Sequence, residues 1–217
     1  MINAVVFDVG ETLVDETRQH GEWADWLGVP RHTFSAVFGA MVATGLEFRD
    51  ALLLFQPDFD LPTERRRRAE AGSIDEFTGA DLYPDTRPCL AALRDLGVWV
   101  GIAGNQPASA EHLLRAMALP ADLIATSQGW GVSKPDPRFF ARLSAAVPFP
   151  PDQVAYVGDR VDNDMKPAKA AGLHTIYLRR GPWGFIWAGH PDLAASADWR
   201  VTSLAEIPPL IAAANRD

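Results

Sequence analysis

The stretch AVVFDVGETL, residues 4–13, is the part of the chain from which the fold can be predicted most directly. Its first four residues are apolar and favour a β-strand, and a carboxylate, Asp8, follows at once. A strand without a polar face must be covered on both sides, which is typical of a parallel sheet between two layers of helices. Ligands of such sheets bind beyond the carboxyl ends of the strands. The stretch therefore predicts an α/β fold with Asp8 at its ligand-binding edge.

The same alternation of strand and helix continues through most of the chain. Further β-rich apolar runs lie at 98–104, 122–126, 154–158 and 174–178, with a weaker one at 199–202. Helical patterns occupy 88–97, 109–119, 136–147, 162–172 and 203–214. Strands that alternate with helices predict a doubly wound parallel sheet.

One long segment interrupts this alternation, because no strand pattern appears between Asp15 and Leu82. Residues 34–42 carry apolar side chains at helical spacing, and 51–55 and 64–71 also look helical. We therefore predict a core domain, residues 1–14 and 83–217, with a small all-helical domain, residues 15–82, inserted after the first strand. The basic run 65–68 has acidic neighbours and is interpreted as a solvated helix face.

Composition excludes several classes of protein. The net charge of −8 argues against non-specific nucleic-acid binding, which needs a clustered basic surface. The single cysteine, Cys89, permits neither an intrachain disulfide nor a cysteine metal cluster, and fits a reducing cytoplasm. No apolar run approaches the ~20 residues of a membrane span. We expect a cytoplasmic protein with a small-molecule substrate and no nucleic-acid or membrane partner; the oligomeric state stays open.

Candidate site residues, most of them polar, lie where the predicted strands end. They are Asp8 after the first strand, Gly104 and Asn105 at the second, Lys134 after the third, and Asp159 and Asp164 after the fourth. In a parallel sheet, three carboxylates and one lysine then converge on one edge. Carboxylates this close repel one another, and a divalent cation relieves the repulsion. A site lined by oxygen atoms, with few protein ligands, suits Mg²⁺.

These residues resemble the motifs of the haloacid dehalogenase superfamily of hydrolases and phosphotransferases. FDVGETL is similar to its first motif, GIAGNQ to the second, VSKPDPRFF to the third and YVGDRVDNDMKPAKAAG to the fourth, in the same order along the chain. The helical insert stands where that family has a mobile cap. The resemblance implies a Rossmann-like core with a cap domain.

The resemblance also implies a role for each residue. Asp8 would be the nucleophile, whose carboxylate attacks phosphorus and forms an aspartyl-phosphate. Lys134 would pair with Asp8 and with the transferred group. The ligands of Mg²⁺ would be Asp8, Asp159, Asp164 and the backbone carbonyl of Gly10. The metal would neutralise the phosphoryl oxygens, so that one anion can attack another.

Two positions depart from the family pattern. Phosphatases of the family carry a second Asp two residues after the nucleophile, which protonates the leaving group and then activates water; here that position is Gly10. Losing a positioned acid/base costs a factor of about 10²–10⁴. Gly104 replaces a Ser or Thr, which leaves its backbone N–H and Asn105 to bind the phosphoryl group. Glu11 either replaces the lost acid/base or is a solvated turn residue.

Three functions follow from this pattern. The sequence favours a Mg²⁺-dependent phosphatase of a small phosphorylated metabolite, slow or restricted to good leaving groups such as acyl and aryl phosphates. A haloacid dehalogenase-type hydrolase also lacks the second Asp but needs no metal, whereas Asp159 and Asp164 are both kept here. The third is a Mg²⁺- or phosphate-binding protein whose catalysis has decayed. Phosphonate-cleaving members use a cap lysine, and residues 15–82 contain none.

Two further groups of residues have no assigned role. The segment 179–191, RRGPWGFIWAGHP, is interpreted as a loop whose aromatic residues pack it down rather than form a contact surface. In the insert, Arg18, His20 and Trp23 either face the substrate cavity or pack within the insert.

Overall fold

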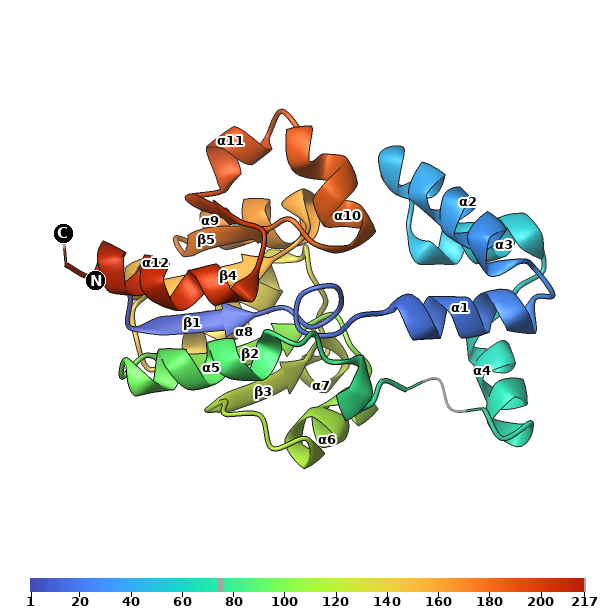
Figure 1. The fold of residues 1–217 in the computed structure, drawn as a ribbon, viewed down its shortest axis with the longest axis horizontal. Coiled ribbons are helices and arrows are strands. Elements are labelled where there is room, and N and C mark those ends of the chain that lie inside the picture. The colour runs from blue at the N-terminus through green and yellow to red at the C-terminus, as the bar shows by residue number, and fades with distance from the viewer. Residues whose placement is uncertain (74–75, 217) are drawn as a thin grey trace. The chain divides into compact units, whose positions relative to one another are not determined.

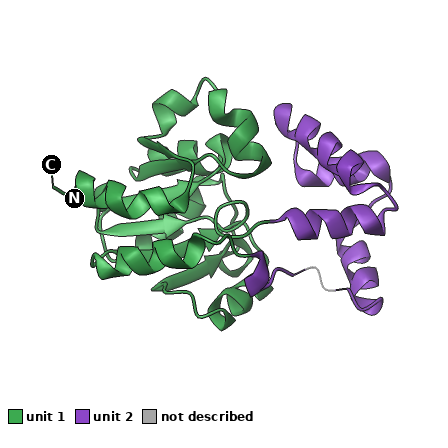
Figure 2. Ribbon diagram, in the orientation of Figure 1, with its two compact units in different colours: residues 1–15, 82–217 green, residues 16–81 purple. Residues whose placement is uncertain are grey.

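The computed structural model describes residues 1–73 and 76–216. The chain forms two compact units, residues 1–15 with 82–217 and residues 16–81 (Figure 2). The predicted domain ranges include residues 74–75 and 217, which lie outside the described residues. Among the residues described, none of the helices combines the length and the apolar character that crossing a bilayer requires.

The first unit is built on one six-stranded sheet in which all neighbouring strands are parallel. The strands are β1 (Ala4–Phe7), β2 (Trp99–Gly104), β3 (Leu123–Thr126), β4 (Val154–Gly158), β5 (His174–Leu178) and β6 (Trp199–Val201), in the order β3-β2-β1-β4-β5-β6. From β1 the chain first builds outward through β2 and β3, then returns to the other side of β1 with β4. The predicted doubly wound fold is confirmed, and its switch point lies between β1 and β4.

Helices cover both faces of the sheet (Figure 1). They are α5 (Thr86–Asp95), α6 (Ala108–Ala116), α7 (Ser127–Trp130), α8 (Pro137–Ala146), α9 (Lys166–Ala170), α10 (Gly181–Ile186), α11 (Leu193–Ser196) and α12 (Ile207–Ala214). Phe139, Phe140 and Leu143 of α8 belong to the same buried apolar cluster as Val6 of β1 and Tyr156 of β4. This packing explains why one face of the strands is apolar, and Val5, Phe7, Ala155 and Val157, which alternate with these positions, are buried as well.

Two segments differ from the sequence-based prediction. Residues 162–172 do not form one helix, because a π-helical turn at Val161–Met165 precedes α9. The segment 179–191 is not a loop but contains α10 and a 3₁₀ turn at Trp187–Gly189. The packing interpretation holds for Trp183, which is buried against the guanidinium of Arg160, 3.7 Å from its ring centroid. It is wrong for Phe185, which is 59% exposed.

The second unit is helical. It contains α1 (Thr17–Trp26), α2 (Arg31–Ala43), α3 (Phe48–Phe55), α4 (Leu61–Glu70) and a 3₁₀ turn at Gly79–Asp81. Within this unit His20 stacks on Phe48, with ring centroids 4.5 Å apart, and Arg18 is paired with Asp81, Nε to Oδ1 2.8 Å. Trp23 is buried. All three side chains named in the insert therefore make packing contacts inside their own unit.

The interpretation of residues 65–68 as a solvated helix face is wrong for Arg68. This side chain is 1% exposed, lies 4.2 Å from the ring centroid of Trp23 and donates to Glu22 at 3.1 Å. Glu64, one helical turn earlier, is also buried and accepts a hydrogen bond from Trp26. Residues four apart share one face of a helix, so the charged side chains on one face of α4 are buried within the unit.

Candidate active site

Three carboxylates meet at the switch point between β1 and β4. Asp8 directly follows β1, and its backbone N–H donates to the carbonyl of Val157 in β4 at 2.9 Å. Asp159 directly follows β4, and Asp164 lies on the π-helical turn. One carboxylate oxygen from each of Asp8, Asp159 and Asp164 lies within 4.8 Å of the other two. The structure thus brings together the three carboxylates that the sequence pointed to.

Lys134 joins this cluster from the loop after α7. Its Nζ lies 2.8 Å from Asp8 Oδ1 and 2.6 Å from Asp164 Oδ1, and its side chain is 1% exposed. Asn105 fixes the backbone of Lys134 on both sides: its Oδ1 accepts the Lys134 N–H at 2.8 Å, and its Nδ2 donates to the Lys134 carbonyl at 2.9 Å. The loop therefore delivers the ammonium group to two carboxylates at once.

This arrangement affects two residues expected to bind the phosphoryl group. The Asn105 amide holds the Lys134 loop, so its donation to a phosphoryl group stays a prediction. Gly104 is the last residue of β2, and a Cβ there would overlap Asp8 Oδ1. A Cβ at Gly158 would likewise overlap the carboxylate of Asp164. Both glycines let a carboxylate approach the backbone, and a side chain at 104 would require the Asp8 carboxylate to shift.

The cluster is electrostatically strained. Burial raises the pKa of the Asp164 carboxyl to about 6, although the nearby Lys134 charge opposes the rise. Burial, followed by the charges of Asp164 and Asp8, raises the pKa of Asp159 well above its ordinary value. Burial alone would lower the pKa of Lys134, but the charges of Asp164 and Asp8 outweigh it and raise that pKa. One ammonium group does not balance three carboxylates, so the site favours a further cation.

The donor set fits a magnesium ion. Asp159 Oδ2 is buried and has no hydrogen-bond partner among the described residues, which leaves an acceptor oxygen for a cation. Three carboxylates within 4.8 Å of one another are the hard oxygen donors that Mg²⁺ prefers. The Gly10 carbonyl as a fourth donor stays a prediction.

We expect the metal-free chain to gain stability as the pH falls from about 8 to about 5. The folded-state pKa of Asp164, about 6, lies above its ordinary value of 3.8, so the ionised group costs folding free energy. The cost is full above about pH 6 and shrinks as the pH falls from 6 towards 3.8. Mg²⁺ offsets the same cost, so the rise in Tm on adding MgCl₂ should be largest near pH 8. Thermal unfolding in EDTA and in MgCl₂ measures both. A Mg²⁺ effect that grows toward pH 5 contradicts this account.

Sequence reasoning missed Tyr156. This buried side chain donates its hydroxyl proton to the Ala103 carbonyl at 2.7 Å and accepts from Lys134 Nζ at 3.0 Å. The three protons of the Lys134 ammonium thus face Asp8, Asp164 and Tyr156. A tyrosine inside a strand that is apolar on both faces needs a partner for its hydroxyl, and this is the pattern from which it could have been found.

Glu11 is not a solvated turn residue. Its side chain is buried, and the hydroxyl of Tyr83 donates to its Oε2 at 2.6 Å. Its charge is one of those that raise the pKa of Asp159, so Glu11 lies near the carboxylate cluster.

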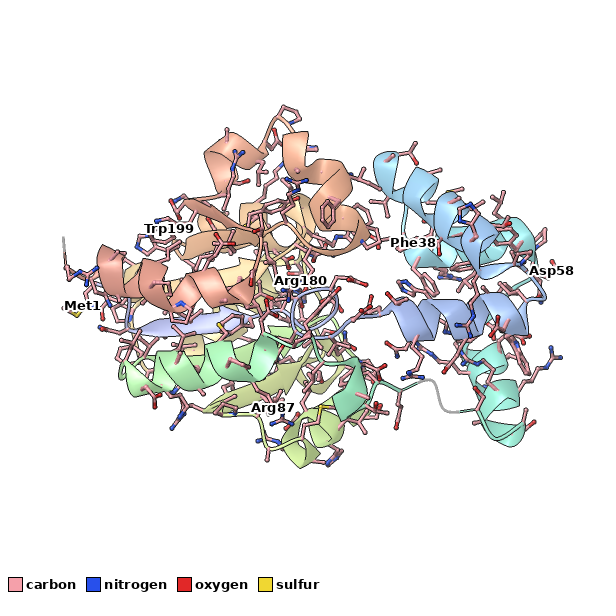
Figure 3. All side chains as sticks on the ribbon, in the orientation of Figure 1. Met1, Phe38, Asp58, Arg87, Arg180 and Trp199 are labelled. Atoms are coloured by element: carbon pink, nitrogen blue, oxygen red, sulfur yellow. The ribbon has the colours of Figure 1, made fainter. Side chains whose placement is uncertain are left out.

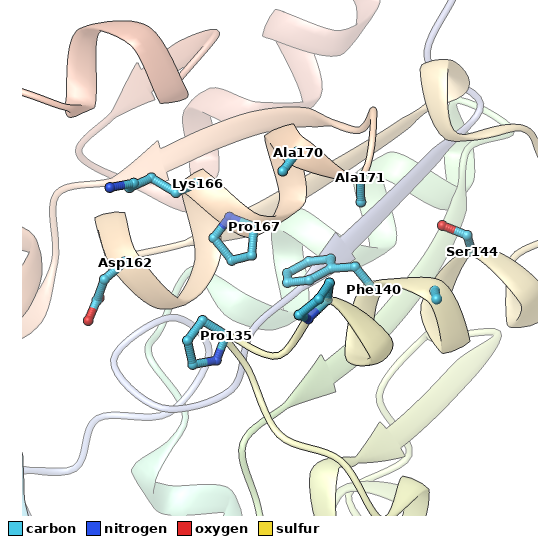
Figure 4. A pocket seen from close by; sticks show the side chains of 10 residues that line it. Pro135, Phe140, Ser144, Asp162, Lys166, Pro167, Ala170 and Ala171 are labelled. Atoms are coloured by element: carbon cyan, nitrogen blue, oxygen red, sulfur yellow. The ribbon is translucent and has the colours of Figure 1, made fainter.

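Figure 4 shows a mostly apolar cavity of about 650 Å³. It is lined by side chains of α8 and α9 and of the segments before them, among them Pro135, Phe140, Asp162 and Lys166. Asp8, Asp159 and Asp164 are not among its lining residues. The candidate site is therefore assigned from the carboxylate cluster and not from this cavity.

A doubly wound sheet with this cluster at its switch point, and a helical unit inserted after β1, defines the class of haloacid dehalogenase-like hydrolases. The model of that family, described as haloacid dehalogenase-like hydrolase, matches residues 2–172. The chain belongs to this family.

Its relatives include named phosphatases. The chain is 30% identical over 193 residues to Phosphatase MT3486 of Mycobacterium tuberculosis, and the aligned residues cover 82% of this chain and 88% of the relative. It is 28% identical over 207 residues to a glyceraldehyde 3-phosphate phosphatase of Methanopyrus kandleri, and the aligned residues cover 84% of this chain and 86% of that relative. The solved structure of the HAD-hydrolase YfnB of Bacillus subtilis, bound to magnesium, shares the fold with a TM-score of 0.70 at 18% identity, covering 97% and 98%.

Proposed function

We propose that the chain is a Mg²⁺-dependent phosphatase of a small phosphorylated metabolite, which acts through an aspartyl-phosphate at Asp8. The observation that carries the proposal is the position of Lys134 Nζ, paired with both Asp8 and Asp164, in a cluster whose third carboxylate, Asp159, has a buried oxygen without a hydrogen-bond partner among the described residues. The names of the relatives support phosphate-ester hydrolysis.

The reaction assigns one task to each residue. A carboxylate oxygen of Asp8 forms a bond to phosphorus as the bond from phosphorus to the leaving oxygen breaks; water then hydrolyses the aspartyl-phosphate and restores the carboxylate. Lys134 holds Asp8 Oδ1 and keeps the nucleophile in one orientation. The backbone N–H of Gly104 and the Asn105 side chain bind the phosphoryl oxygens.

The metal would be held by Asp8, Asp159, Asp164 and the Gly10 carbonyl. When bound, it supplies positive charge against the phosphoryl oxygens. The structure of YfnB of Bacillus subtilis, which shares the fold, is bound to magnesium, and this supports the assignment. Residues 15–82 are proposed as a cap domain that selects the substrate, on a core of residues 1–14 and 83–217.

The leaving group limits the substrate range. Gly10 has no side chain to protonate a departing alkoxide, whereas aryl and acyl phosphates release phenolates and carboxylates, which are stable anions and need no proton. We therefore propose good leaving groups as the substrates turned over fastest. Dehalogenation is the second candidate, because halide departure also needs no proton. The cluster of three carboxylates disfavours it, since it repels an anionic haloacid until a cation is bound.

An activity screen tests the proposal. The purified chain is assayed with p-nitrophenyl phosphate, an alkyl phosphate and 2-chloropropionate, in MgCl₂ and in EDTA. The expected result is hydrolysis of the aryl ester only in MgCl₂, with slower hydrolysis of the alkyl ester. Halide release that persists in EDTA would establish the dehalogenase instead. Inactivity on every substrate would support the third function, a Mg²⁺- or phosphate-binding protein whose catalysis has decayed.

We expect Gly10→Asp to raise turnover of alkyl phosphates at least about tenfold, because it restores a carboxyl group where the family places its acid/base. Turnover of p-nitrophenyl phosphate should change much less, since its leaving group needs no proton. The ratio of the two kcat values measures this. An unchanged ratio in a folded variant would mean that proton transfer does not limit the wild-type reaction.

A further inference from the structure

Glu11 has a backbone conformation that residues with side chains rarely adopt. Its φ is +51°, in the left-handed region, yet its side chain is buried in the loop that joins Asp8 to Val14. A strained conformation persists only where the surroundings hold it, and such positions concentrate at functional sites. The contacts of Glu11 show what holds this residue.

Two neighbours fix its side chain. The Tyr83 hydroxyl donates to Glu11 Oε2 at 2.6 Å. Gly181, the first residue of α10, lies against the aliphatic part: a Cβ there would stand 2.6 Å from Glu11 Cβ and 2.7 Å from its Cγ. Glu11 therefore fills the space that a side chain at 181 would need, and this contact requires a glycine.

Arg180 connects the same residues to the loop backbone. Its guanidinium lies 4.0 Å from the ring centroid of Tyr83, and its Nη1 donates to the Thr12 carbonyl at 2.9 Å. It also pairs with Asp85. Figure 3 labels Arg180 near the loop that follows β1. Tyr83 and Gly181 thus hold the loop through the side chain of Glu11, and Arg180 holds it through the carbonyl of Thr12.

We propose that Glu11 is a positioning residue, whose buried carboxylate, held by Tyr83 and seated on Gly181, fixes the loop that presents Asp8 to the substrate. The inference rests on the proposed phosphatase function. It differs from the acid/base role, because an acid/base must exchange a proton with the leaving group, whereas a positioning residue needs only the shape and the acceptor oxygen. Glutamine supplies both.

The test compares Glu11→Ala, Glu11→Gln and Tyr83→Phe on p-nitrophenyl phosphate and on an alkyl phosphate, in MgCl₂. Misplaced reacting groups lower the rate of any substrate, so we expect Glu11→Ala and Tyr83→Phe to lower kcat about tenfold on both esters, with KM almost unchanged. Glu11→Gln should keep most of the wild-type kcat on both esters. If Glu11→Gln is as damaging as Glu11→Ala, and the loss is larger for the alkyl ester, Glu11 is an acid/base and the positioning role is overturned.

Two glycines provide a matched control that leaves the polar groups in place. Gly181 and Gly172 have φ values of +62° and +84°, so alanine is strained at both. At Gly172 the nearest atom to a new Cβ is Pro151 Cβ at 3.6 Å, an ordinary contact remote from Glu11. Both alanine variants should lower Tm, but only Gly181→Ala should also lower kcat. Equal kcat values would overturn the proposal.

The two proposals fail in different ways. A wild-type chain that hydrolyses neither ester overturns the phosphatase function, and the role of Glu11 in it falls as well. An active wild-type chain whose kcat survives Glu11→Ala and Tyr83→Phe overturns the positioning role alone.

Discussion

Asp8→Asn should abolish hydrolysis of p-nitrophenyl phosphate, with a loss of at least about 10³-fold in kcat, because the amide cannot replace the carboxylate as nucleophile. The substitution keeps the size of the side chain, so its effect reports chemistry and not packing. Steady-state kinetics in MgCl₂ measure it.

The stability of the same variant is its control. Asp8 is one of three clustered carboxylates, of which two pair with the single lysine Lys134, and removal of its charge relieves repulsion within the cluster. The metal-free variant should therefore unfold at the same Tm as the wild type or at a higher one. A variant that is folded and as active as the wild type would exclude Asp8 as the nucleophile.

Lys134→Met should destabilise the chain strongly as well as inactivate it. Removing one partner of a buried ion pair costs about 3–5 kcal/mol, because the remaining charges are left unpaired. At roughly 2–4 °C per kcal/mol for a chain of this size, Tm should fall by about 10 °C. The measurement is thermal unfolding in EDTA near pH 8, where Asp164 is ionised.

Lys166 supplies the matched control for this substitution. Its Nζ pairs with Asp192 at 2.7 Å, but both side chains are about half exposed, and such pairs contribute at most about 1 kcal/mol. Lys166→Met should therefore shift Tm by no more than a few degrees. In addition, Asp164→Asn should recover part of the Tm lost in Lys134→Met, since it removes one of the unpaired charges. Equal effects at positions 134 and 166 would contradict the buried ion-pair account.

The sequence was enough to predict most of the fold. β4 and β5 have the residues that their apolar runs indicated, and the other strands differ from theirs by at most one residue at one end. This succeeds because strands buried on both faces are the most apolar segments of a doubly wound sheet, with few competing interpretations. The meeting of Asp8, Lys134, Asp159 and Asp164 followed from the same topology, since it requires only that parallel strands end at one edge.

What the sequence did not reveal depends on contacts between residues distant in the chain. Arg68 was misjudged because a run of arginines does not show which face of its helix is buried. The 72 positions that separate Glu11 from Tyr83 leave no local pattern, and the left-handed backbone at Glu11 is set by its neighbours and not by its own preference. Tyr156 was overlooked because an aromatic residue in a strand is unremarkable until its hydroxyl has a known partner.

The most direct test of the central claim is a crystal structure of the chain with Mg²⁺ and beryllium fluoride, which mimics a phosphoryl group on a carboxylate. The account predicts beryllium bonded to a carboxylate oxygen of Asp8, and one Mg²⁺ about 2.1 Å from oxygens of Asp8, Asp159 and Asp164. Lys134 should lie against Asp8 in the same structure. A magnesium ion bound elsewhere, or an Asp8 without beryllium beside an occupied metal site, would contradict it.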